Sequence, residues 1–119
     1  MHLEQLKQLV LDTLSDTKAK DVCVMDVRGK TAVTDYMIVA SGTSDRHVKA
    51  IAETIAFRAK EAGQPPLGTE GLKEGEWALI DLNGVVAHVM LPKVRDYYNL
   101  ERLWSPPAAV PRAAAVRCP

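Results

Sequence analysis

The sequence predicts an α/β protein, more closely an α+β sandwich in which helices flank a mixed sheet of about five strands. Three observations lead to this class: two long segments with apolar residues at helical spacing, several short β-branched apolar runs, and an Asn-Gly pair between two of those runs. With 119 residues, 47% of them apolar, the chain has the size and composition of one globular domain with its own core.

The first half of the chain alternates between helices and strands. Apolar residues recur every three or four positions through residues 2–19, which predicts an amphipathic helix. The runs VCVMDV at 22–27 and DYMIVAS at 35–41 predict buried strands. The first run is apolar on both faces, as expected of a strand covered by helices on either side. A second helical stripe begins after Ser44 and stops at Gly63.

The clearest local signal is a β-hairpin. WALIDL and VVAHVML are separated only by Asn83 and Gly84, a pair that tolerates the two positive φ angles of a type I′ turn. That turn places Leu79 opposite His88, and opposed residues share a face of the sheet. One face of the hairpin is then wholly apolar. The other, here called the mixed face, carries Trp77, Leu79, Asp81, Val86, His88 and Met90. Such a face is half covered by a helix or is offered to a partner.

The remaining segments complete the domain. A short edge strand is expected around Thr69–Gly71, and a last helix or irregular turn over residues 94–104. From Ser105 onward the chain is rich in proline and alanine without periodicity, which predicts a disordered tail at 105–119. We therefore expect a single domain, residues 1–104, followed by that tail.

Charge, cysteine content and hydropathy narrow the class of function. Fifteen basic residues balance fifteen acidic ones, so the field that drives nonspecific binding to phosphate backbones is absent and direct nucleic acid binding is not expected. Cys23 and Cys118 are too few for a disulfide framework and predict two free thiols in a reducing compartment. Neither a signal peptide nor an apolar membrane span is visible, so we expect a cytoplasmic location and no membrane partner.

The segment SGTS, residues 41–44, is the first candidate for chemistry. It joins a buried strand to a helix, and helix N-termini after such corners bind phosphate in many proteins. However, the segment has neither the Gly-Lys pair of a Walker loop nor GxGxxG spacing. Ser44 followed by Asp45 favours an ordinary helix N-cap.

Catalytic and metal-binding patterns are weak in the rest of the chain. Nucleotidyltransferases place paired carboxylates beside such a corner to hold two metal ions. Here Asp81 has only the amide of Asn83 as a neighbour, although Asp26 and Asp35 could converge on the site in the folded chain. No HxxxH, CxxC or HExxH spacing is present, so we expect neither a metal ligand nor a catalytic residue. A metal-dependent, nucleotide-binding enzyme is the alternative function.

An acidic stretch surrounds the tryptophan that begins the hairpin. TEGLKEGEWALID contains Glu70, Glu74, Glu76 and Asp81 around Trp77, but a single lysine. An aromatic anchor flanked by acidic groups suits a basic protein partner. Alternatively, Trp77 is buried in the core and the acidic residues form a solvated loop. The composition of the stretch leaves both interpretations open.

Three blocks, TDYMIVASGTSDRHVKAIAE, GEWALIDLNGVVAHVMLP and RDYYNLERLW, resemble in order and spacing the signature blocks of the ribosomal silencing factor family, also called Iojap-like proteins. The resemblance covers residues 3–104. It implies a homodimer that is not an enzyme, needs no cofactor, and has a fold similar to nucleotidyltransferases without their carboxylate pair. It also implies binding to ribosomal protein fourteen of the large subunit, which blocks joining of the small subunit and represses translation when nutrients are short.

The same resemblance places the partner-binding surface on the hairpin and its exit. The residues expected to contact the partner are Trp77, His88, Leu91, Pro92, Tyr97 and Tyr98, with Glu70, Glu76 and Asp81 as orienting charges. A structural role is the alternative for some of them, because Tyr97 or Tyr98 suits a core and Pro92 suits the start of a helix. The chain departs from the family at Lys93, where an acidic residue is common, and at Asn83–Gly84, where an Asp or Gly-Asp turn is frequent.

Overall fold

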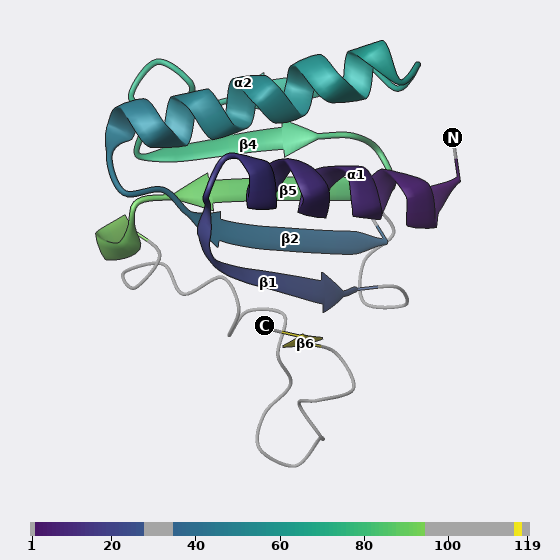
Figure 1. Cartoon of the computed structure of the whole chain (residues 1–119), viewed down its shortest axis with the longest axis horizontal. Coiled ribbons are helices and arrows are strands. Elements are labelled where there is room, and N and C mark those ends of the chain that lie inside the picture. Colours follow the sequence, from purple (N-terminus) through teal and green to yellow (C-terminus); the bar gives the residue numbers. More distant parts are fainter. Residues whose placement is uncertain (1, 28–34, 95–115, 118–119) are drawn as a thin grey trace.

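A mixed sheet with helices on one side makes up most of the described chain (Figure 1). The structure, a computed structural model, describes residues 2–27, 35–94 and 116–117. In chain order the elements are α1 (Leu3–Asp16), β1 (Lys20–Asp26), β2 (Tyr36–Ser41), α2 (Asp45–Glu61), β3 (Gly68–Glu70), β4 (Trp77–Asp81), β5 (Val85–Met90) and β6 (Val116–Arg117). The strand order is β3-β4-β5-β2-β1-β6, with β2 and β5 parallel and the other neighbours antiparallel. The predicted fold class is therefore confirmed.

The larger core lies between the sheet and the two helices α1 and α2, which pack side by side on the same face (Figure 1). Both helices turn an apolar stripe toward the strands, as their three- and four-residue spacing predicts. The buried helix residues are Leu6, Val10, Leu14, Val48, Ile51, Ala52, Ile55 and Ala59. They meet alternate strand residues, namely Tyr36, Ile38, Ala40, Ala78, Ile80, Leu82, Val85, Ala87 and Val89.

A second, smaller apolar cluster lies on the opposite face of the sheet. Its buried members are Met25, Val27, Met37, Val39 and Met90, against which Trp77 and Val94 pack. The apolar run at 22–27 predicted a strand with helices on both faces. Within the described ranges both long helices lie on one face, and the outward residues of β1 are buried by this cluster instead. α1 and α2 therefore lie on the same side of β1, and the last helix expected at 94–104 lies outside the described residues apart from Val94.

The hairpin forms with the predicted register, including Leu79 opposite His88 and Trp77 opposite Met90. Its turn differs from the predicted type I′, because Asn83 has a φ of 76° while Gly84 is not in the left-handed region. Gly84 serves a different purpose. A Cβ at this position would lie 2.7 Å from Cδ1 of Leu3, so the missing side chain lets α1 approach the hairpin.

The corner at residues 41–44 is a capped helix start. Ser44 is the N-cap of α2, and its hydroxyl accepts a hydrogen bond of 3.1 Å from the backbone N–H of His47. Gly75 lies against the same helix end, since a Cβ there would be 2.7 Å from the carbonyl oxygen of Asp45. The N-cap interpretation is therefore confirmed, and the loop that contains Gly75 packs on the first turn of the helix.

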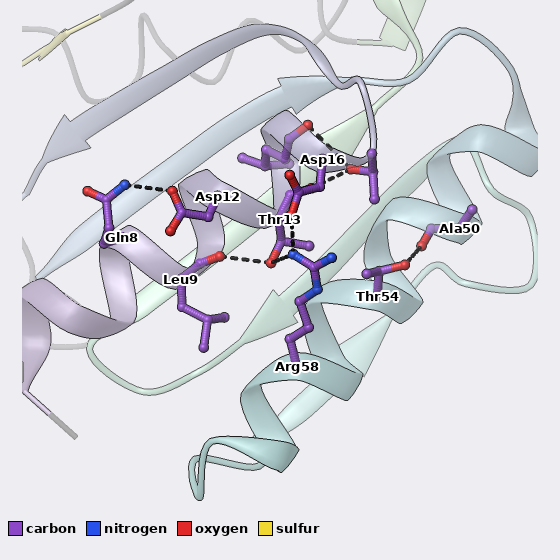
Figure 2. A network of polar contacts seen from close by, with 10 residues as sticks. Gln8, Leu9, Asp12, Thr13, Asp16, Ala50, Thr54 and Arg58 are labelled. Atoms are coloured by element: carbon purple, nitrogen blue, oxygen red, sulfur yellow. Dashed lines mark hydrogen bonds and ion pairs between the residues drawn. The ribbon is translucent and has the colours of Figure 1, made fainter.

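Polar contacts join the two helices along their outer side (Figure 2). Arg58 of α2 reaches across to α1, where its Nη1 forms a 2.7 Å ion pair with Asp16 and lies 3.4 Å from the hydroxyl of Thr13. At the start of α2, Nε2 of His47 lies 2.7 Å from the carbonyl oxygen of Thr17, the C-cap of α1. These contacts fix the two helices relative to each other above the core.

The C-terminal part of the chain is described only in places. Pro92 begins a helical turn that is described as far as Val94, and the helix expected over residues 94–104 otherwise lies outside the described residues. Within the predicted tail, Val116–Arg117 form β6 and pair with β1; the other residues of 105–119 are outside the described part. In the part of the chain that the structure describes, no helix is long and apolar enough to cross a membrane.

Cys23 corrects one expectation from the sequence. It is buried in β1, 5% exposed, and it is disulfide-bonded, so the prediction of a free thiol at this position is wrong. The prediction rested on the number of cysteines, since two are too few for a disulfide framework. It could not show that β1 is a neighbour of the chain's C-terminal strand.

Candidate partner-binding surface

Trp77 and His88 form the centre of the mixed face. Trp77 lies at the start of β4 and His88 in the middle of β5, and the antiparallel register makes them diagonal neighbours on one face. Nε1 of the indole donates a hydrogen bond of 3.0 Å to Nδ1 of the imidazole. The ring centroids are 5.9 Å apart with an interplanar angle of 49°. The sequence predicted the shared face, and the structure adds a direct contact between the two rings.

The environment of His88 decides its charge. The side chain is 6% exposed, and burial lowers the pKa of His88 from its ordinary 6.5 to about 4. The imidazole is therefore neutral at pH 7. Because Nδ1 accepts the hydrogen bond from Trp77, the ring proton lies on Nε2. A neutral His88 thus orients the tryptophan ring, which is itself half-buried against the second apolar cluster.

Carboxylates lie along the edge of this face beyond His88. Sheet register places Leu79 opposite His88, and Glu70 of the edge strand β3 opposite Leu79. Glu70 is exposed, whereas Asp81 is half-buried. Asp81 also has a local role, because its Oδ1 accepts a hydrogen bond of 2.9 Å from the backbone N–H of Asn83 in the hairpin turn. Glu70 is consequently the acidic residue of the pair that is more available to a partner.

The other predicted contact residues are more dispersed. Glu76 is exposed, and its backbone carbonyl accepts a 2.9 Å hydrogen bond from the N–H of Leu91. Leu91 packs against the core under the helices, on the opposite side of the sheet from Trp77. Pro92 is exposed at the start of its helical turn. The structure therefore does not place Leu91 beside the Trp77–His88 pair. Tyr97 and Tyr98 lie outside the described residues.

Sequence reasoning missed the second apolar cluster, on which Trp77 packs. Met25, Met37 and Met90 are each 6% exposed or less and belong to the cluster on which the indole packs. The alternation of side chains along each strand could have identified which residues share a face. Their assembly, however, depends on the parallel pairing of β2 with β5, which joins residues as far apart in the sequence as Tyr36 and Val85 and leaves no local signal.

Asp26 and Asp81, two of the carboxylates considered for metal binding, lie on different faces of the sheet. Asp26 is paired with Tyr36, a residue of the core under the helices, whereas Asp81 is paired with Val86 on the mixed face. The two side chains therefore start from opposite faces of the sheet. Among residues 2–27, 35–94 and 116–117 there is no group of three or more His, Cys, Asp or Glu side chains that could hold a metal ion.

A separate groove runs between the two helices on the far side of the sheet from Trp77. It has a volume of about 630 Å³ and is lined by Gln5, Gln8, Leu9, Asp12, Thr13, Arg58 and Ala62. Part of its polar lining is already paired, since Gln8 donates to Asp12 at 2.8 Å and Arg58 is held by Asp16 (Figure 2). None of the predicted partner-binding residues that the structure describes lines this groove.

Comparison with known proteins identifies the family of the chain. The family model described as "Ribosomal silencing factor during starvation" matches residues 1–117. The "Ribosomal silencing factor RsfS" of Chromobacterium violaceum is 45% identical over 104 residues, covering 87% of this chain and 85% of the relative. A mouse relative, "Mitochondrial assembly of ribosomal large subunit protein 1", is 33% identical over 82% of this chain and 44% of its own length.

Comparison with solved structures points to the same family. A crystal structure of a Chromobacterium violaceum protein superposes with a TM-score of 0.86 at 44% identity, covering 95% of this chain and 97% of the other. The family match over nearly the whole chain, the sequence identity and the shared fold agree with one another. The chain belongs to the ribosomal silencing factor family.

Proposed function

We propose that this protein binds ribosomal protein fourteen of the large ribosomal subunit through its mixed face and thereby blocks joining of the small subunit. Family membership supports a role at the ribosome. The observation that carries the choice of surface is the Trp77–His88 pair, a half-buried indole held in place by a neutral imidazole. Translation would be repressed when nutrients are limiting, in the cytoplasm.

The physical features of the Trp77–His88 pair suit a protein interface. Tryptophan residues that are already ordered lose little conformational freedom on binding, and they are frequent among residues that dominate binding energy. The indole N–H of Trp77 is satisfied by His88, so a partner can cover the ring without leaving a buried donor unpaired. The pair therefore offers an apolar anchor whose polar atom already has its partner.

Charge favours a basic partner over nucleic acid. Glu70 and Glu76 are exposed and Asp81 is half-buried, and all three flank the Trp77–His88 pair in sequence or register. Their field would repel phosphate and attract lysine or arginine side chains. The net charge of the whole chain is zero at pH 7, so this attraction would be local to one edge.

The proposed mechanism is steric. A folded domain bound where the two subunits must approach prevents their contact by occupying the space, and it needs no bond-making step. Binding in the form of a homodimer, as the family resemblance implies, would increase the volume that is blocked. Sedimentation equilibrium of the purified chain tests the dimer: a mass of about 26 kDa is expected, twice the 13.0 kDa of the chain, and a single 13 kDa species would contradict it.

Substitution of the anchor tests the choice of surface. Trp77→Ala should weaken binding to isolated large subunits by at least about thirtyfold, or about 2 kcal/mol. Phe57→Ala is the matched control, because Phe57 is an aromatic residue of α2 that is 63% exposed on the helix-covered side. Binding of fluorescently labelled chain to large subunits gives both dissociation constants. Equal affinity of Trp77→Ala and the unmodified chain would contradict docking by this face.

A second substitution separates loss of binding from loss of folding. Trp77 packs on the second apolar cluster, so its removal also costs stability. Glu70→Lys reverses a charge on an exposed side chain of the same face and should leave the fold intact. We expect it to weaken binding severalfold, with less dependence on salt than in the unmodified chain. Glu53→Lys, an exposed residue of α2, should bind normally. An equal loss of affinity in Glu70→Lys and Glu53→Lys would argue against docking by the mixed face.

A further inference from the structure

The hairpin turn between β4 and β5 places an asparagine directly before a glycine, at Asn83 and Gly84. Asparagine is one of the thermolabile residues, because its side-chain amide can be lost by deamidation. The reaction is favoured when the next residue is glycine, since a glycine has no Cβ to hinder an attack by its own backbone nitrogen. In a folded chain it also depends on the exposure of the asparagine and on the hydrogen bonds that hold the turn.

Both reacting groups of this pair are free in the folded chain. Asn83 is exposed, and among the residues that the structure describes its side-chain amide has no hydrogen-bond partner. Within residues 2–27, 35–94 and 116–117, neither the carbonyl of Asn83 nor the N–H of Gly84 forms a protein hydrogen bond. The peptide unit between the two residues can therefore rotate and bring the nitrogen toward the amide without breaking such a bond.

The atoms on either side of this peptide unit are held in place. The backbone N–H of Asn83 donates a hydrogen bond of 2.9 Å to Oδ1 of Asp81. The carbonyl of Gly84 accepts two hydrogen bonds of 3.0 Å, from the backbone N–H groups of Asp35 and Tyr36. These bonds fix both ends of the turn, so the nucleophile and the amide stay adjacent while the peptide unit between them rotates.

We propose that Asn83 deamidates spontaneously in the folded chain and that the isoaspartate product loosens the β4–β5 hairpin. The backbone nitrogen of Gly84 loses its proton to the solvent and attacks Cγ of Asn83. The amide nitrogen takes up a proton and leaves as ammonia, which closes a cyclic succinimide. Water then opens the ring at either carbonyl carbon. In total one water molecule is consumed and one ammonia is released, and nothing is oxidised or reduced.

The two products differ in their effect on the turn. Aspartate keeps the length of the backbone and tolerates the left-handed φ of 76° found at Asn83, so it adds only a negative charge beside Asp81. Isoaspartate routes the backbone through the former side chain and lengthens it by a methylene group. That group lies between Leu82 and Val85, whose backbone N–H and carbonyl form a hydrogen bond of 2.9 Å across the turn. The longer backbone is expected to break this bond.

The loosened turn would reach the mixed face through the strands that it joins. β4 carries Trp77 and β5 carries His88, and their register is set by the turn. The reaction itself needs only water and proceeds with or without a partner. It is therefore independent of the proposed docking, and its failure would leave that proposal intact.

Ageing of the full chain in heavy-oxygen water tests the reaction. Folded chain and chain unfolded in guanidinium are incubated in parallel at neutral pH, and peptides that contain residue 83 are analysed by mass spectrometry with fragmentation that separates isoaspartate from aspartate. We expect both products, each with an oxygen from the water. The rate in the folded chain should be within about tenfold of the unfolded rate, because local opening of a turn costs little. Asn83→Gly, which keeps the left-handed turn without an amide, should not react.

Hydrogen exchange tests the effect on the hairpin. The isoaspartate form is purified from the aged chain and compared with the unaged chain and with Asn83→Asp. The amides of β4 and β5 should exchange at least about fivefold faster in the isoaspartate form than in the unaged chain. Asn83→Asp should exchange like the unaged chain, because its backbone has the original length.

Three results would overturn the proposal. A folded chain that keeps its amide while the unfolded chain loses it would show that the turn protects Asn83. Aspartate without isoaspartate would show direct hydrolysis of the side chain in place of attack by Gly84. Equal exchange of β4 and β5 in the isoaspartate form, in Asn83→Asp and in the unaged chain would show that the added methylene group leaves the hairpin unchanged.

Discussion

At the scale of single residues, the contact between Trp77 and His88 determines the character of the mixed face. The histidine is a neutral acceptor because burial lowers its pKa to about 4, and the indole N–H donates to it. This hydrogen bond satisfies the indole N–H and Nδ1 of the imidazole. The two residues therefore act together as an apolar, ordered patch at neutral pH.

The buried histidine should make stability depend on pH. Its pKa is lower in the folded than in the unfolded chain, so the unfolded chain binds the additional proton and stability falls as pH drops from 6.5 toward 4. Between pH 7 and pH 5 this histidine should reduce the free energy of unfolding by about 2 kcal/mol. Urea unfolding at the two pH values measures the change.

His88→Asn is the matched variant for this measurement. The Asn side-chain oxygen can accept the hydrogen bond from Trp77, but the amide does not titrate. The other titratable groups contribute equally to the pH dependence of stability in the unmodified chain and in the variant. The pH dependence of the variant should therefore be smaller by the amount that His88 supplies. An unchanged dependence would mean that His88 is not buried as a neutral group.

The sequence predicts part of this site and not the rest. The Asn83–Gly84 turn fixes the hairpin register, from which the shared face of Trp77 and His88 follows. The hydrogen bond between them depends on side-chain rotamers, which no pattern of residue types specifies. The second apolar cluster under Trp77 depends on the pairing of β2 with β5, two strands that are distant in the sequence. Leu91 lies on the other side of the sheet from Trp77, where one further step of the alternation Val85, Ala87, Val89 would have placed it.

At the scale of elements, the start of α2 depends on a close approach between the helix and the preceding corner. A Cβ at Gly42 would lie 2.7 Å from Cγ2 of Val48 and 3.0 Å from its backbone nitrogen. Because one of these atoms belongs to the backbone, the helix itself would have to shift. The same corner holds Ser44, the N-cap of α2.

Gly42→Ala should reduce the free energy of unfolding by about 1–3 kcal/mol, since the added methyl group overpacks the corner. Gly68→Ala in β3 is the control, because nothing lies within 4 Å of its Cβ position and its φ is not positive. That variant should stay within about 0.5 kcal/mol of the unmodified chain. Urea unfolding at pH 7 measures both. Equal stability of the two variants would show that α2 tolerates a shift at its N-terminus.

Most helices and strands could be predicted because each is specified by a pattern of residues within its own segment. The amphipathic stripes, the β-branched runs and the Asn-Gly turn identify α1, α2, β1, β2, β4 and β5 within a few residues of their observed ends. β3 is displaced by one residue from the segment expected. The turn type was wrong because the small size of Gly84 is needed for contact with Leu3 and not for a positive φ.

At the scale of the whole molecule, the arrangement leaves the two faces of the sheet unequal. α1 and α2 cover one face (Figure 1). The opposite face carries the Trp77–His88 pair, with acidic residues at its edge. Strand order and the side on which helices pack depend on contacts between distant segments, so residue patterns alone did not predict them. In the part of the chain that the structure describes, the face opposite α1 and α2 is the one assigned to docking in the proposed function.

The joining of ribosomal subunits tests the central claim most directly. Purified large and small subunits are mixed at a magnesium concentration that supports joining, with the chain, with Trp77→Ala or with Phe57→Ala, and are separated by sedimentation. We predict that the chain and Phe57→Ala keep the subunits apart, whereas Trp77→Ala allows them to join. Normal joining in the presence of the unmodified chain, at a concentration that saturates the large subunits, would contradict the account.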